Sequence, residues 1–337
     1  MGTVESMSPR HRLVALLVVV LWGLNFLAIR YGLDYFPPLF LGALRFLVLA
    51  LPVLLFVRPP KGPVTWLLLY GLGSGTFQFG LLFTAMHIGM PTGLASLVLQ
   101  SSAPFTVLLG AVLLHEKLAV RQIAGIGIAV VGMGLIIADR ADAAAGVGVL
   151  GVVLTLLGGL SWAFGNIGQR LAAPSEPFRF TLWMSVIPPL PMLALSALVE
   201  GPTTGWKALA HSLDGAEGRL ALLGVAYIAI LSTVVGYGLW GALMARYPAS
   251  TVAPATLLVP VVGIAASAIV LGEHPTALAL TGAAIVIAGC LLGMLRKPAS
   301  ALPGDEGGGT GGELDVTVPD DLRERGAQGG PAVLRQG

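Results

Sequence analysis

The sequence predicts an all-α polytopic membrane protein with ten transmembrane helices. Of its 337 residues, 55% are hydrophobic and only 11% are charged, whereas an average globular domain is about 25% charged. The mean hydropathy is +0.86. Runs of roughly 20 mostly apolar residues, the length that crosses a bilayer core as a helix, recur along most of the chain. A chain with so little polar surface cannot cover itself in water, so most of it is expected to face lipid.

Charged residues, prolines and glycines separate the apolar runs and give the expected spans. These spans are 13–33, 38–57, 64–86, 91–114, 118–138, 147–170, 179–199, 219–244, 249–271 and 277–295. The links at 87–91 and 272–276 are so short that the helices they join must be antiparallel neighbours. Residues 1–12 form an N-terminal segment, and the glycine-rich residues 298–337 are predicted to be a disordered tail because they cannot bury an apolar face.

Basic residues predict the orientation, because lysine and arginine concentrate in cytoplasmic loops. The side shared by both termini carries Arg10, Arg12, Arg58, Lys61, Lys117, Arg121, Arg170, Arg179, Arg246, Arg296 and Lys297. The opposite side carries Arg30, Arg140, Lys207 and Arg219. Both termini are therefore expected in the cytoplasm, with the spans in the plasma membrane.

The two halves of the chain repeat one another. LWGLNFLAIR at 21–30 is echoed by SWAFGNIGQR at 161–170, so that Trp22 and Arg30 match Trp162 and Arg170. Further matches at an offset of 157 are Tyr70 with Tyr227, Ala85 with Ala242, Pro91 with Pro248, Glu116 with Glu273, Gly125 with Gly282 and Gly132 with Gly289. Six matches in one frame indicate a duplication, with a first repeat at 13–138 and a second at 147–295.

Each repeat contains five spans, and an odd number makes the second copy enter the membrane from the opposite side. Inverted repeats are a recurrent build of secondary transporters, in which two matched halves alternate around a site near the midplane. The repeat therefore predicts transport by alternating access.

Several stretches resemble the EamA group of the drug/metabolite transporter superfamily. They are WGLNFLAIRYGLDYFPPLFLGALRF (22–46), GMPTGLASLVLQ (89–100), SWAFGNI (161–167), VGYGLWGALMARY (235–247) and LLVPVVGIAASAIVLGE (257–273). The wording is particularly similar to bacterial members that export O-acetylserine and cysteine. This resemblance implies export of small amino acids or their metabolites across the plasma membrane. The alternative is an exchanger or facilitator of another metabolite, such as a nucleotide sugar, which would favour more basic residues than Arg45 alone.

Arg45 is the most informative candidate for substrate binding. It lies inside the second span between LFLGAL and FLVLAL, with no acid beside it. An arginine at the bilayer centre costs about 2.5–3.5 kcal/mol on insertion scales, so its side chain is expected in the protein interior or in a wet cavity. There it can bind a carboxylate through two hydrogen bonds. The alternative is that it reaches an interface or ties down backbone carbonyls.

Four uncharged amides also lie within apolar spans: Asn25, Gln78, Gln100 and Asn166. Amides donate and accept hydrogen bonds, so they suit a zwitterionic substrate, although isolated amides more often join helices to one another. Four aromatic residues form a second group: Trp22, Trp162, Tyr237 and Trp240. They are expected to wall the pathway around an ammonium group or to anchor helices at the membrane interface.

Pro104 and Pro260 lie at equivalent places in spans four and nine. Each removes a helical hydrogen bond, so matched kinks are expected to shape the cavity. Glu116 and Glu273 end the same two spans and are expected to cap the following helix or hold a hairpin rather than carry protons. The first span has Asn25 and no acid, which argues against drug–proton antiport of the kind used by small multidrug pumps of the superfamily.

Other classes of protein are disfavoured. The histidines His87, His115, His211 and His274 lie at span ends or in loops, and no catalytic or metal-binding motif appears, so we expect neither an enzyme nor a cofactor. The net charge of +2 is spread over loops, which predicts no nucleic-acid partner. Cys290 is expected to be a packing residue. Gly289 and Gly293 offer a face for close helix packing, and a homodimer through this face is possible.

Overall fold

The computed structural model is built from helices throughout the residues that it describes, which are 7–141, 147–247 and 249–294. Ten of its helical stretches are long and apolar enough to cross a membrane. They are Pro9–Leu33, Pro38–Phe56, Val64–His87, Thr92–Leu113, Val120–Asp139, Gly148–Ala172, Pro177–Val199, Ala216–Met244, Ala253–Leu271 and Ala277–Met294. The all-α class and the ten spans are confirmed. The predicted tail at 298–337 lies outside the described residues.

Five spans are single helices: α1 (Pro9–Leu33), α2 (Pro38–Phe56), α7 (Val120–Ala141), α8 (Val147–Ala172) and α16 (Ala277–Met294). The seventh span consists of α9 (Pro177–Met184) and α10 (Pro189–Val199), separated at Pro188, and α11 (Thr204–Ala210) lies in the link that follows. Proline at a first helical position suits the starts of α1, α2, α9 and α10, because its missing N–H would have no helical partner there.

The remaining four spans change helix type along their length. The third contains α3 (Val64–Gly71), the π-helical η1 (Leu72–Phe77) and α4 (Gln78–His87), and the eighth contains α12 (Ala216–Ala226), the π-helical η4 (Tyr227–Val235) and α13 (Gly236–Met244). The fourth contains α5 (Thr92–Val98), the 3₁₀ segment η2 (Leu99–Ser101) and α6 (Ser102–Leu113). The ninth contains the 3₁₀ segment η5 (Ala253–Leu258) and α15 (Val259–Leu271), and the short helix α14 (Ala249–Val252) precedes it.

These interruptions follow the sequence repeat. Shifted by the offset of 157, η1 falls at 229–234, inside η4, and η2 falls at 256–258, inside η5. Pro104 and Pro260 lie just beyond the two 3₁₀ segments, at the third residue of α6 and the second of α15. The expected bends at these prolines therefore coincide with a change of helix type, which the sequence did not reveal. The shared irregularities support the duplication, and the inverted orientation of the halves stays a prediction.

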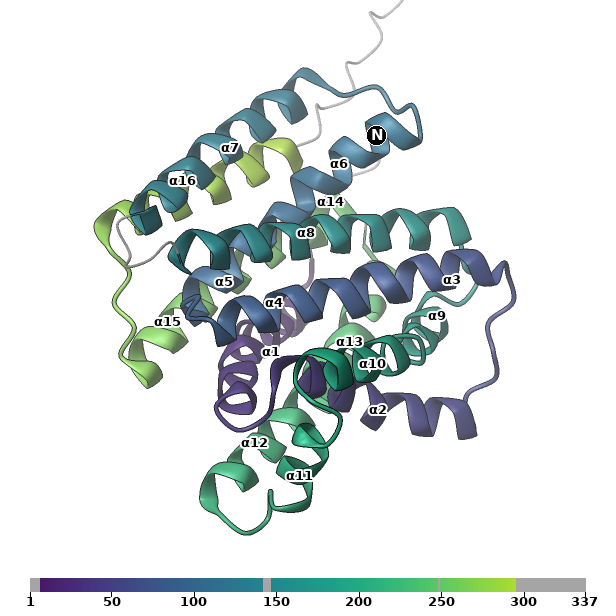
Figure 1. Ribbon diagram of the computed structural model, residues 1–337. Coiled ribbons are helices and arrows are strands. Elements are labelled where there is room, and N and C mark those ends of the chain that lie inside the picture. The colour runs from purple at the N-terminus through teal and green to yellow at the C-terminus, as the bar shows by residue number, and fades with distance from the viewer. Residues whose placement is uncertain (1–6, 142–146, 248, 295–337) are drawn as a thin grey trace, which may run out of the picture. The chain divides into compact units, whose positions relative to one another are not determined.

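Helix packing follows the same frame (Figure 1). The first span, α1, packs against α12, η4, α13 and α15, and the sixth, α8, packs correspondingly against α3, η1, α4 and α6. Three further pairs join equivalent spans: α2 with α10, α5 with α15, and α7 with α16. When each span is replaced by its equivalent in the other half, the contacts of α1 become those of α8, and each of the three further pairs becomes the same pair again.

The α7–α16 pair shows how glycines permit this arrangement. A Cβ atom added to Gly125 would lie 2.5 Å from the carbonyl oxygen of Gly289, and one added to Gly132 would lie 2.7 Å from that of Gly282. Only glycine permits such close contact of two helix backbones. The glycine face of α16 is thus occupied by α7 within the molecule, and a homodimer would have to use another surface.

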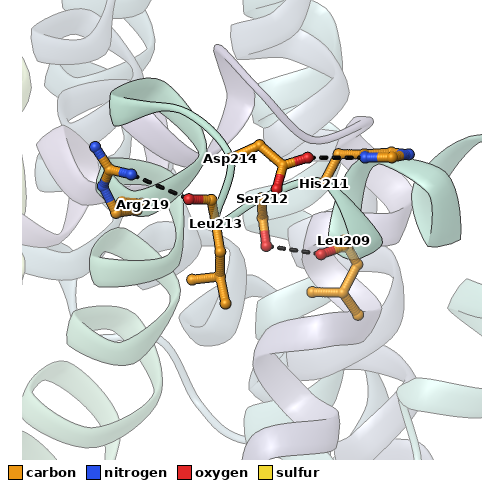
Figure 2. A network of polar contacts seen from close by, with 6 residues as sticks. All are labelled: Leu209, His211, Ser212, Leu213, Asp214 and Arg219. Carbon is orange, nitrogen blue, oxygen red and sulfur yellow. Dashed lines mark hydrogen bonds and ion pairs between the residues drawn. The ribbon is translucent and has the colours of Figure 1, made fainter.

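The link between α11 and α12 carries a local polar network (Figure 2). His211 Nδ1 lies 2.9 Å from Asp214 Oδ2, and both side chains are exposed. Ser212 donates to the carbonyl of Leu209 rather than to His211, and Arg219 donates to the carbonyl of Leu213. Because the serine hydroxyl is turned away from the histidine, these residues form a loop structure and no catalytic triad.

The α7–α16 contact yields a stability prediction. In Gly289→Leu, the new Cβ would lie 2.6 Å from both Ala129 N and Gly125 O, so the helices must separate. We expect a destabilisation of about 1–3 kcal/mol, the usual range for overpacking, seen as a lower midpoint of thermal unfolding in detergent. Gly127→Leu on the same pair is the control, because its Cβ would meet nothing within 4 Å. Equal midpoints for the two variants would contradict the packing described here.

Candidate functional site

A cavity of about 590 Å³ lies among spans of both halves of the chain. All nine residues expected to bind substrate line it: Trp22, Asn25, Arg45, Gln78, Gln100, Trp162, Asn166, Tyr237 and Trp240. Neither proline expected to shape the cavity lines it. Pro104 lies in the wall of a second, smaller hollow, and Pro260 is buried in α15. The sequence candidates therefore come together at one place, although they lie on six different spans, four in the first half and two in the second.

Arg45 extends from α2 into this cavity and is almost completely buried, with 3% of its surface exposed. Its Nη2 donates to Thr233 Oγ1 at 3.2 Å. Its Nε and Nη1 atoms are buried and have no hydrogen-bond partner. Among the described residues, no carboxylate lies within ion-pair distance of the guanidinium. The group thus offers two unused donors and an uncompensated positive charge.

Two aromatic rings and one hydroxyl hold the guanidinium in place. The Cζ atom lies 3.9 Å from the centroid of Phe79 and 4.8 Å from that of Phe46, a cation–π arrangement that attracts the charge without using its N–H groups. Thr233 Oγ1 donates to the carbonyl of Ile228 at 2.9 Å, which leaves its lone pairs for Arg45. The donor orientation of Arg45 is therefore fixed before any ligand arrives.

The π-helical segment η4 supplies Thr233, the hydroxyl partner of Arg45. A π turn shifts backbone carbonyls out of their usual pairing and is often found at functional sites. In η4, the carbonyl of Ser232 accepts from Trp22 Nε1 at 3.0 Å. Trp22 in turn packs against Tyr237 and Trp240, with ring centroids 5.2 and 5.4 Å apart. These three rings form one aromatic wall of the cavity, which makes an interfacial anchor the poorer interpretation for them.

The four amides divide into two kinds. Gln100 Nε2 donates to the carbonyl of Thr256 in η5, and Asn166 Nδ2 donates to Thr106 Oγ1, so both join neighbouring spans. Asn25 Oδ1 is buried without a partner. For the Gln78 amide we find no hydrogen bond within the described residues. Joining helices accounts for the first two amides, whereas the last two retain groups that a ligand could satisfy.

Several lining residues escaped the sequence reasoning, among them Phe79, Gln169, Phe178, Thr181 and Thr233. The sequence held a clue to Thr233: at the offset of 157 it matches Thr76 in η1, so a threonine recurs at equivalent places in the two halves. No such signal marked Phe79, which only the packing of α4 against α2 brings over Arg45.

The cavity extends toward one side of the membrane. Gln169, Phe178, Met244 and Met294 line it, and each lies within a few residues of the span end on the side where α1 begins. The opposite side is filled by a hydrophobic core that includes Ile29, Phe36, Phe40, Phe83 and Met86. Toward that opposite side, the described lining reaches Leu82 on the third span and Ser96 on the fourth, but not the last residues of either span end.

On the side filled by the hydrophobic core, two carboxylates each bind the first backbone N–H groups of a helix from another span. Glu273 accepts from the backbone N–H groups of Thr92 and Gly93 at 2.8 and 3.0 Å. Glu200, which the sequence reasoning had not singled out, accepts from those of Leu39 and Phe40 at 2.6 and 3.1 Å. Glu116, on the other side, pairs with Arg170. Neither Glu116 nor Glu273 lines the cavity, but their bonds differ from the expected ones: Glu273 binds the start of α5 rather than the helix that follows it, and Glu116 binds Arg170 of α8.

The cavity has a definite chemical character. Arg45 is its only charged residue among the described lining residues, and aromatic rings, amides and hydroxyls make up much of the remainder. No group of three or more potential metal-ligating side chains occurs in the described part of the chain. Such walls suit a small solute with one carboxylate and some apolar surface.

Comparison with known proteins connects this cavity to a family. The model of the EamA-like transporter family matches the chain twice, over residues 11–138 and 149–295. A probable amino-acid metabolite efflux pump of Salmonella typhimurium is 44% identical over 287 residues, covering 84% of this chain and 94% of that protein. A protein of Escherichia coli K12 with the same description is 42% identical over the same shares of the two chains.

More distant comparisons agree. A probable terminal-alkyne amino-acid exporter of Streptantibioticus cattleyicolor is 28% identical, covering 82% of this chain and 90% of that one. A solved structure, titled only as the crystal structure of a protein, matches with a TM-score of 0.56 at 20% identity over 85% of this chain and 96% of its own. At that identity the solved structure supports the fold alone.

The unpaired guanidinium yields a second prediction. Replacing Arg45 by Met removes a buried charge and two unsatisfied donors, at the loss of one hydrogen bond and two ring contacts. Unsatisfied buried donors cost about 1–3 kcal/mol each, more than the cation–π contacts return at about 0.5–2 kcal/mol. We expect Arg45→Met to unfold at a higher temperature than the wild type in ligand-free detergent solution. A lower unfolding temperature would mean that Arg45 is a structural residue.

Proposed function

We propose that this chain, which belongs to the EamA-like transporter family, exports small amino-acid-like metabolites across the plasma membrane by alternating access. Membership of this family within the drug/metabolite transporter superfamily makes it a multi-pass inner-membrane transporter and not an enzyme. The efflux pumps to which it is more than 40% identical are described as acting on amino-acid metabolites. Cysteine and O-acetylserine, which the sequence resemblance implied, are the first substrates to test.

The observation that carries the proposal is the pair of unused donors on Arg45. Nε and Nη1 face no protein acceptor, while one of the two N–H groups of Nη2 donates to Thr233. Nη2 lies between the other two nitrogens on the planar guanidinium, so a carboxylate can accept from Nε or Nη1 together with the second N–H of Nη2, and such charge-assisted pairs are stronger than neutral hydrogen bonds. In this proposal the substrate carboxylate supplies the counter-charge that the protein lacks.

The other end of a zwitterion has candidate partners in the same cavity. The unpaired Oδ1 of Asn25 accepts hydrogen bonds from an ammonium group. The faces of Trp22, Tyr237 and Trp240 attract a positive charge through their π systems. Asn25 and Trp22 lie nearly one helical turn apart on α1. A zwitterionic amino acid therefore meets complementary groups for both of its charges.

The side of the membrane toward which the cavity extends is the side from which an exporter would bind its substrate. Under the predicted orientation, with both termini in the cytoplasm, the cavity reaches the cytoplasmic span ends. An exporter takes up its substrate from that side. Release on the other side requires the core around Phe36 and Phe83 to part and the starts of α2 and α5 to leave Glu200 and Glu273. Two inverted halves provide equivalent arrangements for the two states.

A nucleotide-sugar exchanger or facilitator is the second candidate, and the cavity favours it less. A diphosphate brings at least two negative charges, whereas Arg45 is the only cation among the described lining residues. Coupling to a proton gradient is a class expectation, and no carboxylate among those lining residues offers a proton carrier.

Transport by inside-out vesicles tests the substrate and the role of Arg45 together. We expect vesicles containing the wild type to accumulate labelled cysteine or O-acetylserine, and Arg45→Gln to reduce the initial rate about tenfold or more, since a hydrogen bond to a charged group contributes about 1.5–3 kcal/mol. Arg58→Gln, an exposed arginine just beyond the end of the same span, is the matched control and should transport normally.

The outcomes of this assay are separable. Uptake of neither solute by the wild type would reject these substrates, and equal rates for wild type and Arg45→Gln at equal membrane levels would reject the binding site. Uptake that needs an imposed proton gradient would indicate antiport, and uptake that ignores it would indicate a facilitator.

Access to the cavity can be measured with single cysteines introduced into a Cys290→Ser background. Phe178→Cys and Met244→Cys place thiols at the cavity mouth, and Leu213→Cys places one in the exposed link on the opposite side. With a membrane-impermeant maleimide, we expect the first two to be labelled in inside-out vesicles and the third only in intact spheroplasts. The reverse pattern would overturn the predicted orientation.

A further inference from the structure

We propose that a second hollow, between α6 and the α7–α16 pair, binds an acyl chain of an anionic phospholipid. The hollow has a volume of about 260 Å³. Its lining contains no charged residue and comprises Ala103, Pro104, Thr106, Val107, Gln122, Gly125, Ile126, Ala129, Asn166, Gly289, Cys290, Gly293 and Met294. This site does not depend on the identity of the transported substrate.

The hollow follows from how the helices pack. α7 and α16 lie along each other at backbone contact through Gly125 and Gly289, whereas α6 makes far fewer contacts with either of them. Figure 1 shows α7 and α16 side by side, with α6 diverging from them. Small residues of α7 and α16 face the gap, so no side chain fills it. A rigid helix pair and a diverging neighbour thus leave a hollow within the spans.

Each polar side chain in the wall makes at least one hydrogen bond within the protein. Gln122 Oε1 accepts from Ala119 N at 2.9 Å. Asn166 Nδ2 donates to Thr106 Oγ1 at 3.1 Å, and Thr106 Oγ1 donates to the carbonyl of Ser102 at 2.7 Å. A buried water needs two to four polar partners, and an apolar cavity of about 150 Å³ already holds benzene. A larger hollow with this lining suits hydrocarbon.

The surroundings place the hollow beside lipid. Val112 and Leu113 on α6 and Ile123 on α7 expose 69%, 48% and 55% of their surface. Side chains this apolar and this exposed on membrane spans face acyl chains, because no protein covers them. A chain from the adjacent leaflet therefore needs to travel only a short way to enter.

Two basic side chains lie at the end of the hollow where the head group of that lipid would lie. Lys117 and Arg121 are exposed, flank the start of α7 next to Gln122, and form no ion pair within the described residues. The neighbouring Arg170 is different, because Glu116 already neutralises it. A basic residue near an anionic lipid surface contributes about 1 kcal/mol. The two free cations favour a phosphatidylglycerol-like head group over a zwitterionic one.

The hollow shares a wall with the central cavity. Ala103, Asn166 and Met294 line both spaces, and Pro104 lies next to them, just beyond η2. A bound acyl chain would therefore support α6 and α8 from outside, at the point where they bound the central cavity. The lipid would act as a structural cofactor of the cavity wall.

Photo-crosslinking tests the site directly. The purified full-length chain would be reconstituted with a trace of phosphatidylglycerol carrying a diazirine in its acyl chain, and in parallel with the matching phosphatidylcholine. We expect crosslinked peptides to map to residues 103–107, 122–129 and 289–294, more strongly with the anionic lipid. Crosslinks spread evenly over all ten spans would overturn the proposal, because they would indicate only the ordinary lipid annulus.

Two kinds of variant sharpen the test. Gly293→Leu adds a side chain to the wall of the hollow at a position where its Cβ meets nothing within 4 Å, so we expect the fold to be retained and crosslinking to fall several-fold. Gly127→Leu, equally open on α7 but outside the hollow, should not. Lys117→Gln with Arg121→Gln should equalise the two lipids. Undiminished crosslinking in Gly293→Leu would exclude this site.

Discussion

The central cavity is arranged around the guanidinium of Arg45, which is buried without a carboxylate partner among the described residues. Arg45 is placed by α2 inside a protein whose interior offers it no carboxylate among the described residues. The surrounding architecture compensates only in part, through the rings of Phe46 and Phe79 and the hydroxyl of Thr233. Burying an isolated charge costs free energy, and these contacts offset only part of that cost. A ligand that brings a negative charge offsets the remainder, which favours its binding. The cavity walls then restrict the size and polarity of the rest of the ligand.

The duplicated frame supplies the rigidity that such a site requires. Glycines bring α7 and α16 to backbone contact, and Gly165 does the same for α8 against η1, where an added Cβ would lie 2.7 Å from Ser74 N. The π turns then break helical regularity where the halves meet, so that carbonyls and hydroxyls become available to residues of the other half, as Ser232 does for Trp22. Close packing and local irregularity thus serve one purpose, which is to fix side chains around a space that stays open.

Most of the architecture could be predicted from the sequence because lipid imposes simple rules. Span length and the apolar runs, divided at charged residues, prolines and glycines, predicted helix positions that differ from the structure by at most four residues, at the starts of the first and ninth spans. The candidate cavity residues were found because polar and aromatic side chains are conspicuous in apolar spans. Phe79 and Glu200 were missed because a phenylalanine in a membrane span and a glutamate at its end are unremarkable until tertiary packing brings them to α2. The π and 3₁₀ turns also depend on packing, and no local residue pattern specified them.

The placement of Arg45 has a geometric consequence for anything held in the cavity. At the offset that pairs Trp22 with Trp162, the position equivalent to Arg45 in the second half is Ser185, so the duplicated frame carries its charge in one copy only. In the predicted inverted arrangement, a ligand bound to Arg45 would lie off the axis that relates the two halves and would meet them as unlike surfaces. Evolution can therefore change the cavity walls contributed by the second half, and so the range of solutes that bind, while Arg45 stays in place as the single anchoring charge.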